Sequence, residues 1–314
     1  MGIENYIIAF LISWLSASIR MSTSIIFGTI GELYHEKVGV LNLGIEGQMI
    51  IGALVGFLVT KITGNNLWLG VVAGGISGSL ISLILAFFAV SLGLNQHVTG
   101  LGLTFFCTGL SYFIYRIEIG FPKVHPTIES FSTISVPIFS KIPLLGSILF
   151  QQCSLVYVAF VIVALSSFIL YRTSWGLRIR TVGENPTAAD TAGINVFKVR
   201  YLSLIWGGFL IGLGGSFMSL AIFNSFIFGL TAGRGWICLA LVVLGKWKPW
   251  SCMIAALFFG TIDAFQLRLQ ALNINLPYQL LLVLPYVATI IALILASKQA
   301  MSPASLLKPY RREE

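Results

Sequence analysis

The sequence predicts an all-α polytopic membrane protein with about nine (8–10) transmembrane helices, some of them short or broken. Of the 314 residues, 57% are hydrophobic and only 10% are charged, and the mean hydropathy is +0.92. Soluble domains carry about 25% charged residues. Apolar runs of membrane-spanning length also recur along the whole chain, so we expect a single transmembrane domain over residues 1–314.

A transmembrane helix needs roughly 20 mainly apolar residues. The N-terminal run lacks the basic segment and the cleavage site of a signal peptide, so it is expected to be a retained span. A shorter run, 236–245, follows a glycine-rich stretch and is expected to be a short or broken crossing. The expected full-length spans are 5–28, 39–60, 67–92, 97–115, 152–171, 201–224, 250–267 and 276–297.

Basic residues indicate the orientation, because Lys and Arg concentrate in cytoplasmic loops. The loop 172–200 and the tail 298–314 are rich in both, so we expect both segments to be cytoplasmic. The loop 116–151 has few basic residues and is expected outside, as is the N-terminus. The hydrophilic segment 31–39 is then a cytoplasmic connection. The basic residues behind the net charge of +8 fall at the ends of spans, where topology places them. No nucleic-acid partner is therefore expected. Membrane lipids are expected to surround the chain.

Small residues are expected to act in packing. Glycines one helical turn apart let membrane helices approach closely, and cysteines that stand singly in apolar stretches are typical buried residues, so no metal site is expected. The glycine pairs are Gly52 and Gly56, Gly74 and Gly78, and Gly208 and Gly212, and the cysteines are Cys107, Cys153, Cys238 and Cys252.

The loop 172–200 contains a short helix with clear boundaries. An asparagine cap followed by proline marks its start, and a glycine marks its end. So short a helix is only marginally stable alone in water. It must therefore dock on another surface. Its small side chains fit a groove on a partner, whereas a helix lying against its own bundle or the lipid headgroups would need a larger apolar face. The residues that define it are Asn185, Pro186, Ala188, Ala189, Asp190 and Gly193.

Four stretches resemble one family of transport proteins. They are "GVLNLGIEGQM" (39–49), "RTVGENPTAADTAGI" (180–194), "GRGWICLALVVLG" (233–245) and "DAFQLRLQ" (263–270) followed by "PYQLLLVLPY" (277–286). In this order they are similar to the permeases of nucleoside-type ABC importers. That group also includes the permeases for ribose and branched-chain amino acids, and the similarity extends over nearly the whole chain.

The resemblance implies the function and the partners. The chain would be the permease subunit of an importer in the cell membrane of a prokaryote, forming half of a pathway for a small polar solute, with nucleosides expected. An ATP-binding subunit would dock at 185–193 and carry ATP and Mg²⁺, so this chain would bind no cofactor itself. The other partners would be a second permease, either a sister chain or a second copy, and an external solute-binding protein, which is a lipoprotein in many such systems.

Two glycine-rich interruptions, 39–47 and 229–236, place polar residues among or next to apolar ones. Ionisable residues at membrane depth face the bundle interior and mark pathways. We expect Glu46 to stabilise a broken helix beside the route, or to contact the solute. Two structural alternatives remain: Glu46 satisfies the positive end of the helix that follows it, or it pairs with Arg20 or Arg234. The candidate pathway residues are Asn42, Glu46, Gln48, Asn95, Arg234 and Trp236.

Other functions are less compatible with these patterns. The chain has no G-x-x-x-x-G-K-[ST] phosphate loop and none of the common hydrolase or metalloprotease motifs, so it is not expected to be an enzyme. The alternative to an ABC permease is a secondary transporter driven by an ion gradient, in which Glu46 or Asp263 would carry a proton. The docking helix at 185–193 argues against that alternative.

Overall fold

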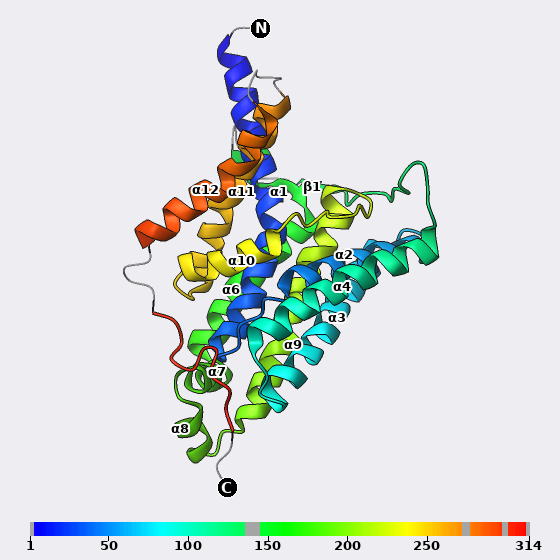
Figure 1. Ribbon diagram of the computed structural model, residues 1–314. Helices are drawn as coiled ribbons and strands as arrows, with labels where there is room; N and C mark the ends of the chain where they lie inside the picture. The colour runs from blue at the N-terminus through cyan, green and yellow to red at the C-terminus, as the bar shows by residue number, and fades with distance from the viewer. Residues whose placement is uncertain (1–2, 136–144, 272–276, 297–300, 312–314) are drawn as a thin grey trace.

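The computed structural model describes residues 3–135, 145–271, 277–296 and 301–311, and within them the chain is almost entirely helical (Figure 1). The elements in order are α1 (Ile3–Lys37), α2 (Ile45–Ile62), α3 (Leu67–Ala86), the π-helical turn η1 (Phe87–Ser91), α4 (Gln96–Ile119), β1 (Thr133–Ser135), α5 (Leu145–Leu149), β2 (Gln151–Cys153), α6 (Ser154–Arg172), α7 (Ser174–Glu184), α8 (Pro186–Thr191), α9 (Val196–Phe217), the π-helical turn η3 (Met218–Ile222), α10 (Arg234–Leu244), α11 (Pro249–Ala271) and α12 (Tyr278–Ala296).

The prediction of an all-α polytopic membrane protein is confirmed. Among the described residues, 7 helices are long and apolar enough to cross a membrane, and the shorter apolar helices Arg234–Leu244 and Gln279–Leu295 add to them. The expected short crossing at 236–245 corresponds to α10. The expected spans 67–92 and 201–224 each end in a π-helical turn, η1 and η3, where the backbone departs from regular α-helix.

The predicted end of the first span was wrong. Residues 31–39 were expected to be a cytoplasmic connection, but α1 continues without a break to Lys37. The physical reason is that its polar residues find partners inside the protein and need no water. Glu32, His35 and Glu36 are at most 1% exposed, and each has a hydrogen-bonding partner from another part of the chain or from the same helix.

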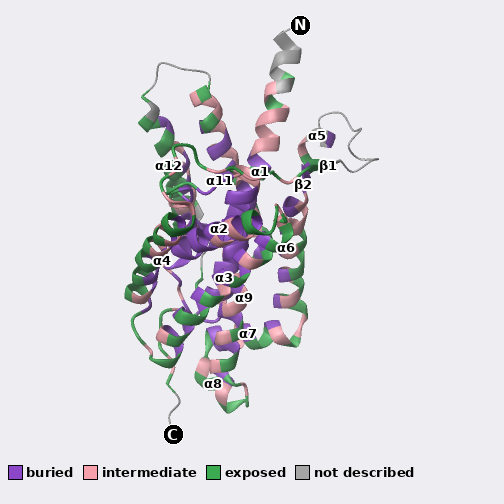
Figure 2. Cartoon of the chain, turned by 90° about the vertical axis from the view of Figure 1, so that its right-hand side faces the viewer, coloured by how far each residue is buried: buried purple, intermediate pink, exposed green. Residues whose placement is uncertain are grey.

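The centre of the bundle is formed by α1, α2, α3 and α9, and Figure 2 shows their buried residues gathered there. Glycines set the distances between these helices. A Cβ atom added to Gly52 or to Gly78 would overlap the backbone of α9, at Gly212 and Gly208 respectively. The predicted role of the glycine pairs in close packing is therefore confirmed, because the contacts leave no room for a side chain.

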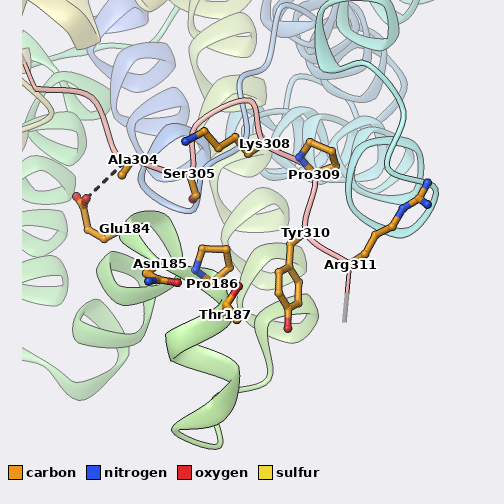
Figure 3. Close-up of a pocket in the computed structure, with 10 residues that line it drawn as sticks. All are labelled: Glu184, Asn185, Pro186, Thr187, Ala304, Ser305, Lys308, Pro309, Tyr310 and Arg311. Atoms are coloured by element: carbon orange, nitrogen blue, oxygen red, sulfur yellow. Dashed lines mark hydrogen bonds between the residues drawn. The ribbon is translucent and has the colours of Figure 1, made fainter. Parts of the chain in front are cut away.

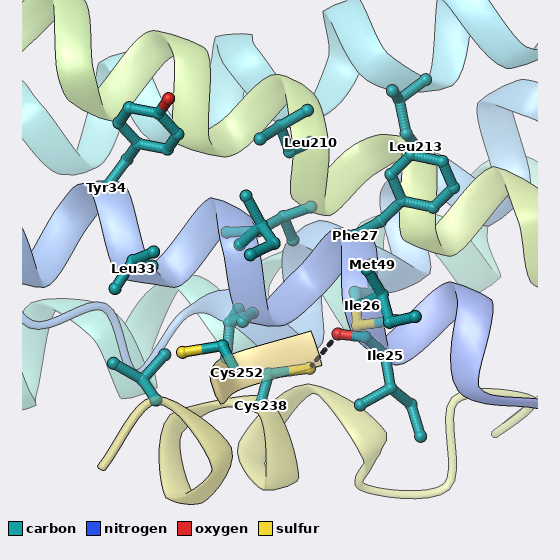
Figure 4. Close-up of a cluster of buried hydrophobic side chains, with 14 of the residues drawn as sticks. Ile25, Ile26, Phe27, Leu33, Tyr34, Met49, Leu210, Leu213, Cys238 and Cys252 are labelled. Carbon is teal, nitrogen blue, oxygen red and sulfur yellow. Dashed lines mark hydrogen bonds between the residues drawn. The ribbon is translucent and has the colours of Figure 1, made fainter. Parts of the chain in front are cut away.

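The core beside α1 is apolar and includes the cysteines. Figure 4 shows Cys238 of α10 and Cys252 of α11 among the aliphatic side chains of α1 and α9. All four cysteines are free and buried, as the sequence predicts. The thiol of Cys238 donates to the carbonyl oxygen of Ile25 at 3.6 Å, which adds a weak polar contact to an otherwise apolar interface.

The connections at the two ends of the bundle carry the remaining elements. Between α4 and α6, where the loop 116–151 was expected, β1 pairs antiparallel with β2 and Thr133 lies opposite Cys153. Residues 136–144 of that loop lie outside the described part. At the opposite end the loop 172–200 contains two helices, α7 and α8, and residues 301–311 of the tail lie against them (Figure 1).

The central packing predicts the effect of adding one methyl group at Gly212. We expect Gly212→Ala to destabilise the protein by about 1–3 kcal/mol, the usual cost of overpacking a tight interior, because the new Cβ would overlap the carbonyl of Gly74 in α3. Thermal unfolding in mild detergent measures the loss. Gly102→Ala in α4 is the matched control, since nothing lies within 4 Å of a Cβ added there. Equal unfolding temperatures for the two variants would contradict the packing.

Candidate functional site

The two glycine-rich interruptions of the sequence meet in space. The chain leaves α1 through Gly39, whose φ is +85°, and enters α2 at Ile45. It enters α10 through Gly233, whose φ is +80° in the left-handed region that favours glycine. The start of α2 is buried, whereas the start of α10 is partly exposed. Their first backbone N–H groups have no intrahelical partners and need acceptors from elsewhere.

Glu46 provides the acceptors for the start of α10. One carboxylate oxygen, Oε1, accepts a hydrogen bond from the Thr231 hydroxyl at 2.6 Å and one from the Gly233 amide at 2.8 Å. The other, Oε2, accepts from the Gly235 amide at 2.7 Å. Hydrogen bonds to an ionised acceptor are short and strong, and the negative charge sits at the positive end of α10. We call this contact between Glu46 and residues 231–235 the helix-start clamp.

The surroundings leave the clamp little freedom. A Cβ atom on Gly235 would overlap the backbone and the carboxylate of Glu46, so glycine is required at this position. The indole of Trp236 donates to the carbonyl of Leu43 at 3.4 Å, a second link between the two interruptions. The Tyr286 hydroxyl of α12 donates to the carbonyl of Ala232 at 3.0 Å. Side chains and backbone from α2, α10 and α12 thus converge here.

Arg234 forms an ion pair next to the clamp. Its Nη2 donates to Oδ2 of Asp263 in α11 at 2.9 Å, and both side chains are largely buried. The expected alternative of an ion pair between Glu46 and Arg234 is therefore not what the structure contains. Arg20, the other candidate partner, is exposed on α1. Arg234 and Asp263 neutralise each other, which lowers the cost of their burial, whereas the partners of Glu46 are backbone amides and a hydroxyl.

A buried polar network lies on the other side of the α1–α2 connection. The side-chain amide of Asn42 donates to Gln48 at 3.0 Å, and Gln48 donates to the Ser82 hydroxyl of α3 at 3.1 Å. The backbone amide of Asn42 donates to Glu32 at 3.0 Å. The Asn42 oxygen also accepts from the Gly44 amide, which fixes the turn that leads into α2. Satisfied networks of this kind rigidify the core that contains them.

His35 completes the network with a defined arrangement of protons. Its Nε2 lies 3.0 Å from the carbonyl oxygen of Leu204, which can only accept, so Nε2 carries a hydrogen. Its Nδ1 lies 3.1 Å from Oε2 of Glu32. The side-chain amide nitrogen of Asn42, which can only donate, also lies 3.2 Å from Nδ1. Nδ1 is therefore an acceptor, and the proton between His35 and Glu32 lies on the carboxyl group, so both side chains are neutral. A neutral pair is the arrangement that a membrane interior tolerates best.

Five of the predicted pathway residues lie in or beside these two groups. Asn42 and Gln48 belong to the buried network, and Glu46, Arg234 and Trp236 to the clamp region. Asn95 lies apart from both: it is the exposed N-cap of α4, where its side chain accepts from the amides of His97 and Val98.

Sequence reasoning missed Glu32, His35, Ser82 and Thr231. The spacing of Glu32, His35 and Glu36 was a usable signal, because positions i, i+3 and i+4 share one face of a helix. The hydrophilic composition of 31–39 instead favours a loop, which hides that face. Ser82 and Thr231 carried no local signal, since a single hydroxyl residue in an apolar or glycine-rich stretch is compatible with many roles.

The short helix in the loop 172–200 is present as predicted. It is α8, and the Asn185 side chain caps it by accepting from the Ala188 amide at 3.0 Å. The helix stops before Gly193, whose φ is +81°. Ala189 is turned inward and buried, whereas Ala188 and Gly193 are exposed. Figure 1 shows α8 at the far end of the molecule from the N-terminus, projecting beyond α7.

Comparison with known proteins identifies the family. The model of the branched-chain amino acid transport system permease component matches residues 14–295, and the chain belongs to this family. A guanosine ABC transporter permease protein of Bacillus subtilis is 36% identical, over 94% of this chain and 95% of the relative. A nucleoside ABC transporter permease protein of Lactococcus lactis is 34% identical, over 90% and 91%.

A third relative carries a different substrate in its name. A protein of Haloferax volcanii named "putative glucose ABC transporter permease protein" is 38% identical, over 95% of this chain and 97% of the relative. No solved structure matches the chain. The resemblance to permeases of the nucleoside type is confirmed, and the chain is a multi-pass membrane protein of this family.

The clamp predicts that Glu46→Gln lowers stability as well as transport. A glutamine side chain presents an N–H₂ group where a carboxylate oxygen now accepts, so the amide of Gly233 or of Gly235 loses its acceptor, at a cost of about 1–3 kcal/mol. The measurement is thermal unfolding together with solute uptake. Glu118→Gln, at an exposed site near the end of α4, is the control. Reduced uptake with unchanged stability would instead point to solute contact.

Proposed function

We propose that this chain is the permease subunit of an ABC importer and forms half of a transmembrane pathway for nucleosides. The observation that carries the proposal is α8, a capped and largely exposed helix of 6 residues in a chain that belongs to the permease family. An ATP-binding subunit docks on α8, and its closure on ATP moves the helix and switches the pathway between outward-open and inward-open states. ATP and Mg²⁺ bind to that subunit.

The geometry of α8 supports a docking role. The helix is too short to be stable by itself, and three features hold it in place: the Asn185 cap, Pro186 at its first position and the inward-facing Ala189. Its outer face presents Thr187, Ala188 and residues 191–193. Small side chains on an exposed helix allow a partner to approach the backbone closely, as in helix-in-groove recognition.

The clamp supports a pathway beside α10. Helix starts within a membrane are tolerated where they are buried in protein or line a water-filled cavity, and transporters place their solute sites at such broken helices. In this proposal Glu46 holds the two helix starts together, and the half-exposed Trp236 and the Arg234–Asp263 pair lie at the edge of the route. The second permease, a sister chain or a second copy, provides the other half of the route.

The gradient-driven alternative would need Glu46 or Asp263 to take up and release a proton. Protonating Glu46 would disrupt a carboxylate that accepts three hydrogen bonds. Protonating Asp263 would break its ion pair with Arg234. Both carboxylates already have structural partners that protonation would weaken, which argues against the gradient-driven alternative. The proposal also places the protein in a prokaryotic cell membrane with its C-terminus in the cytoplasm. It includes an external solute-binding protein as a partner.

Purification from native membranes in mild detergent tests the proposal, with mass spectrometry to identify the co-purifying proteins. We expect an ATP-binding subunit in fixed ratio, a second permease, and ATP hydrolysis that rises with guanosine or another nucleoside but not with glucose. Stimulation by glucose alone would replace the nucleoside assignment. A chain that purified alone and still moved solute in liposomes would contradict the ABC proposal.

The end of α8 predicts that Gly193→Val uncouples hydrolysis from transport. A β-branched residue in the left-handed region costs about 1–2 kcal/mol or more, so α8 would end differently and its outer face would shift. We expect at least a severalfold loss of uptake per ATP hydrolysed, with membrane insertion unchanged. Gly193→Asn is the control, because asparagine tolerates this conformation. Normal coupling in Gly193→Val would remove the reason for assigning α8 this role.

A further inference from the structure

The tail is fastened to the helices α7 and α8 and to the end of α1. The Ser305 amide and hydroxyl both donate to the carbonyl of Gly183, at 3.0 and 2.6 Å. The amide of Leu307 donates to the carbonyl of Gly39 at 3.3 Å. The Tyr310 hydroxyl donates to Oδ2 of Asp190 in α8 at 2.9 Å. We call residues 301–311 the tail segment. The tail segment is therefore bonded to α8, whose movement is proposed to couple ATP hydrolysis to transport, and to the neighbouring α7 and the end of α1.

The tail segment and α8 nevertheless do not pack fully against each other. A cavity of about 520 Å³ lies between them beside the contact of Tyr310 with Asp190, with walls formed by residues 184–187 on one side and by 304, 305 and 308–311 on the other. Figure 3 shows the tail arching over the start of α8, with Tyr310 extending toward the helix. A space of this size accommodates several side chains of another protein. Its walls come from segments more than one hundred residues apart in the chain.

Charge indicates what the cavity accepts. Lys308 and Arg311 line it and are exposed, and no carboxylate in the described part of the chain forms an ion pair with either. Glu184, the acidic residue among the lining residues, is already engaged by the amide of Ala304 at 3.4 Å. Two cationic side chains and one carboxylate line the cavity, so its lining carries a net positive charge. Complementary charge across an interface speeds encounter and selects the correct partner.

We propose that the tail segment is the second wall of the socket in which the ATP-binding subunit docks, and that an acidic segment of that subunit enters the cavity between the tail segment and α8. This inference rests on the proposed function and extends its interface. The cavity is continuous with the outer face of α8, because Asn185, Pro186 and Thr187 line it. A partner seated on α8 would contact Lys308 and Arg311 as well, and its movement would pull on the tail segment directly.

Thiol labelling tests the proposal, because the native cysteines are all buried and an introduced exposed cysteine is the main reactive thiol. We would compare Thr187→Cys on α8, Lys308→Cys on the tail segment and Lys123→Cys in the loop after α4, with and without the ATP-binding subunit. We expect labelling of the first two to slow by about tenfold or more in the complex, since packed interfaces exclude water. Labelling at Lys123→Cys should not change.

The outcomes separate this inference from the function on which it rests. Protection of Thr187→Cys without protection of Lys308→Cys would overturn the second wall and leave docking on α8 intact. An ATP-binding subunit that bound but protected neither would overturn docking on α8 as well. Protection of Lys308→Cys by vesicles of anionic lipid alone, without the ATP-binding subunit, would assign the cavity to a lipid headgroup and overturn the proposal.

A charge reversal provides an independent measurement. The double variant Lys308→Glu with Arg311→Glu should weaken binding of the ATP-binding subunit by about tenfold or more, because like charges would face each other across the interface. The matched control reverses Arg172 and Arg178, which are exposed at the same end of the molecule but do not line the cavity. An equal loss of binding in both double variants would show that net charge alone causes the effect. That result would contradict a specific socket.

Discussion

The carboxylate of Glu46 holds together two helix starts that cannot satisfy their own backbone amides. A helix that begins inside a membrane protein leaves its first N–H groups without partners, and hydrocarbon offers none. Glu46 lies in the first turn of α2 and accepts hydrogen bonds from the first turn of α10 and the residues before it. One side chain of α2 thereby provides acceptors for the start of α10, and Trp236, Arg234 and Tyr286 lie around that start.

The rest of the bundle gives this clamp a rigid frame. Glycines bring α2, α3 and α9 into backbone contact, and the network of Asn42, Gln48 and Ser82 ties the α1–α2 connection to α3. The end of α1 is bonded to α9 through His35 and to the tail segment through Gly39. A movement at α8 can therefore reach the clamp through contiguous bonded contacts. Such a chain of contacts is a physical route for coupling between α8 and the clamp. The proposed experiments measure how much coupling energy passes along it.

Local patterns predicted much of this architecture. Hydropathy located the helices, because each span must satisfy the same thickness of membrane. The spacing of Gly208 and Gly212 predicted close packing, and Asn185, Pro186 and Gly193 predicted the two ends of α8 through capping and left-handed geometry. In each case a residue type has a physical consequence that does not depend on distant parts of the chain.

Local patterns do not predict which residues form hydrogen bonds when they are far apart in the sequence. The donors to Glu46 lie 185 to 189 residues away in the sequence. The local sequence does not indicate which acceptor they bind. For the same reason the segment 31–37 resembles a loop in sequence, since its polar side chains find their partners in the α1–α2 connection, in α9 and in the α10–α11 connection. Asn95, one of the candidate pathway residues, caps the start of α4 with its side chain, and a pathway role for it stays a prediction.

Hydrogen exchange of the amides at the start of α10 tests the central claim most directly. In the purified protein, the segment 231–237 should be protected in the wild type. It should exchange roughly tenfold to a hundredfold faster in Glu46→Ala, the factor that corresponds to losing about 1–3 kcal/mol of local stability. The segment 74–86 of α3 should exchange at the same rate in both. Unchanged exchange over 231–237 in Glu46→Ala would show that Glu46 does not hold the two helix starts together.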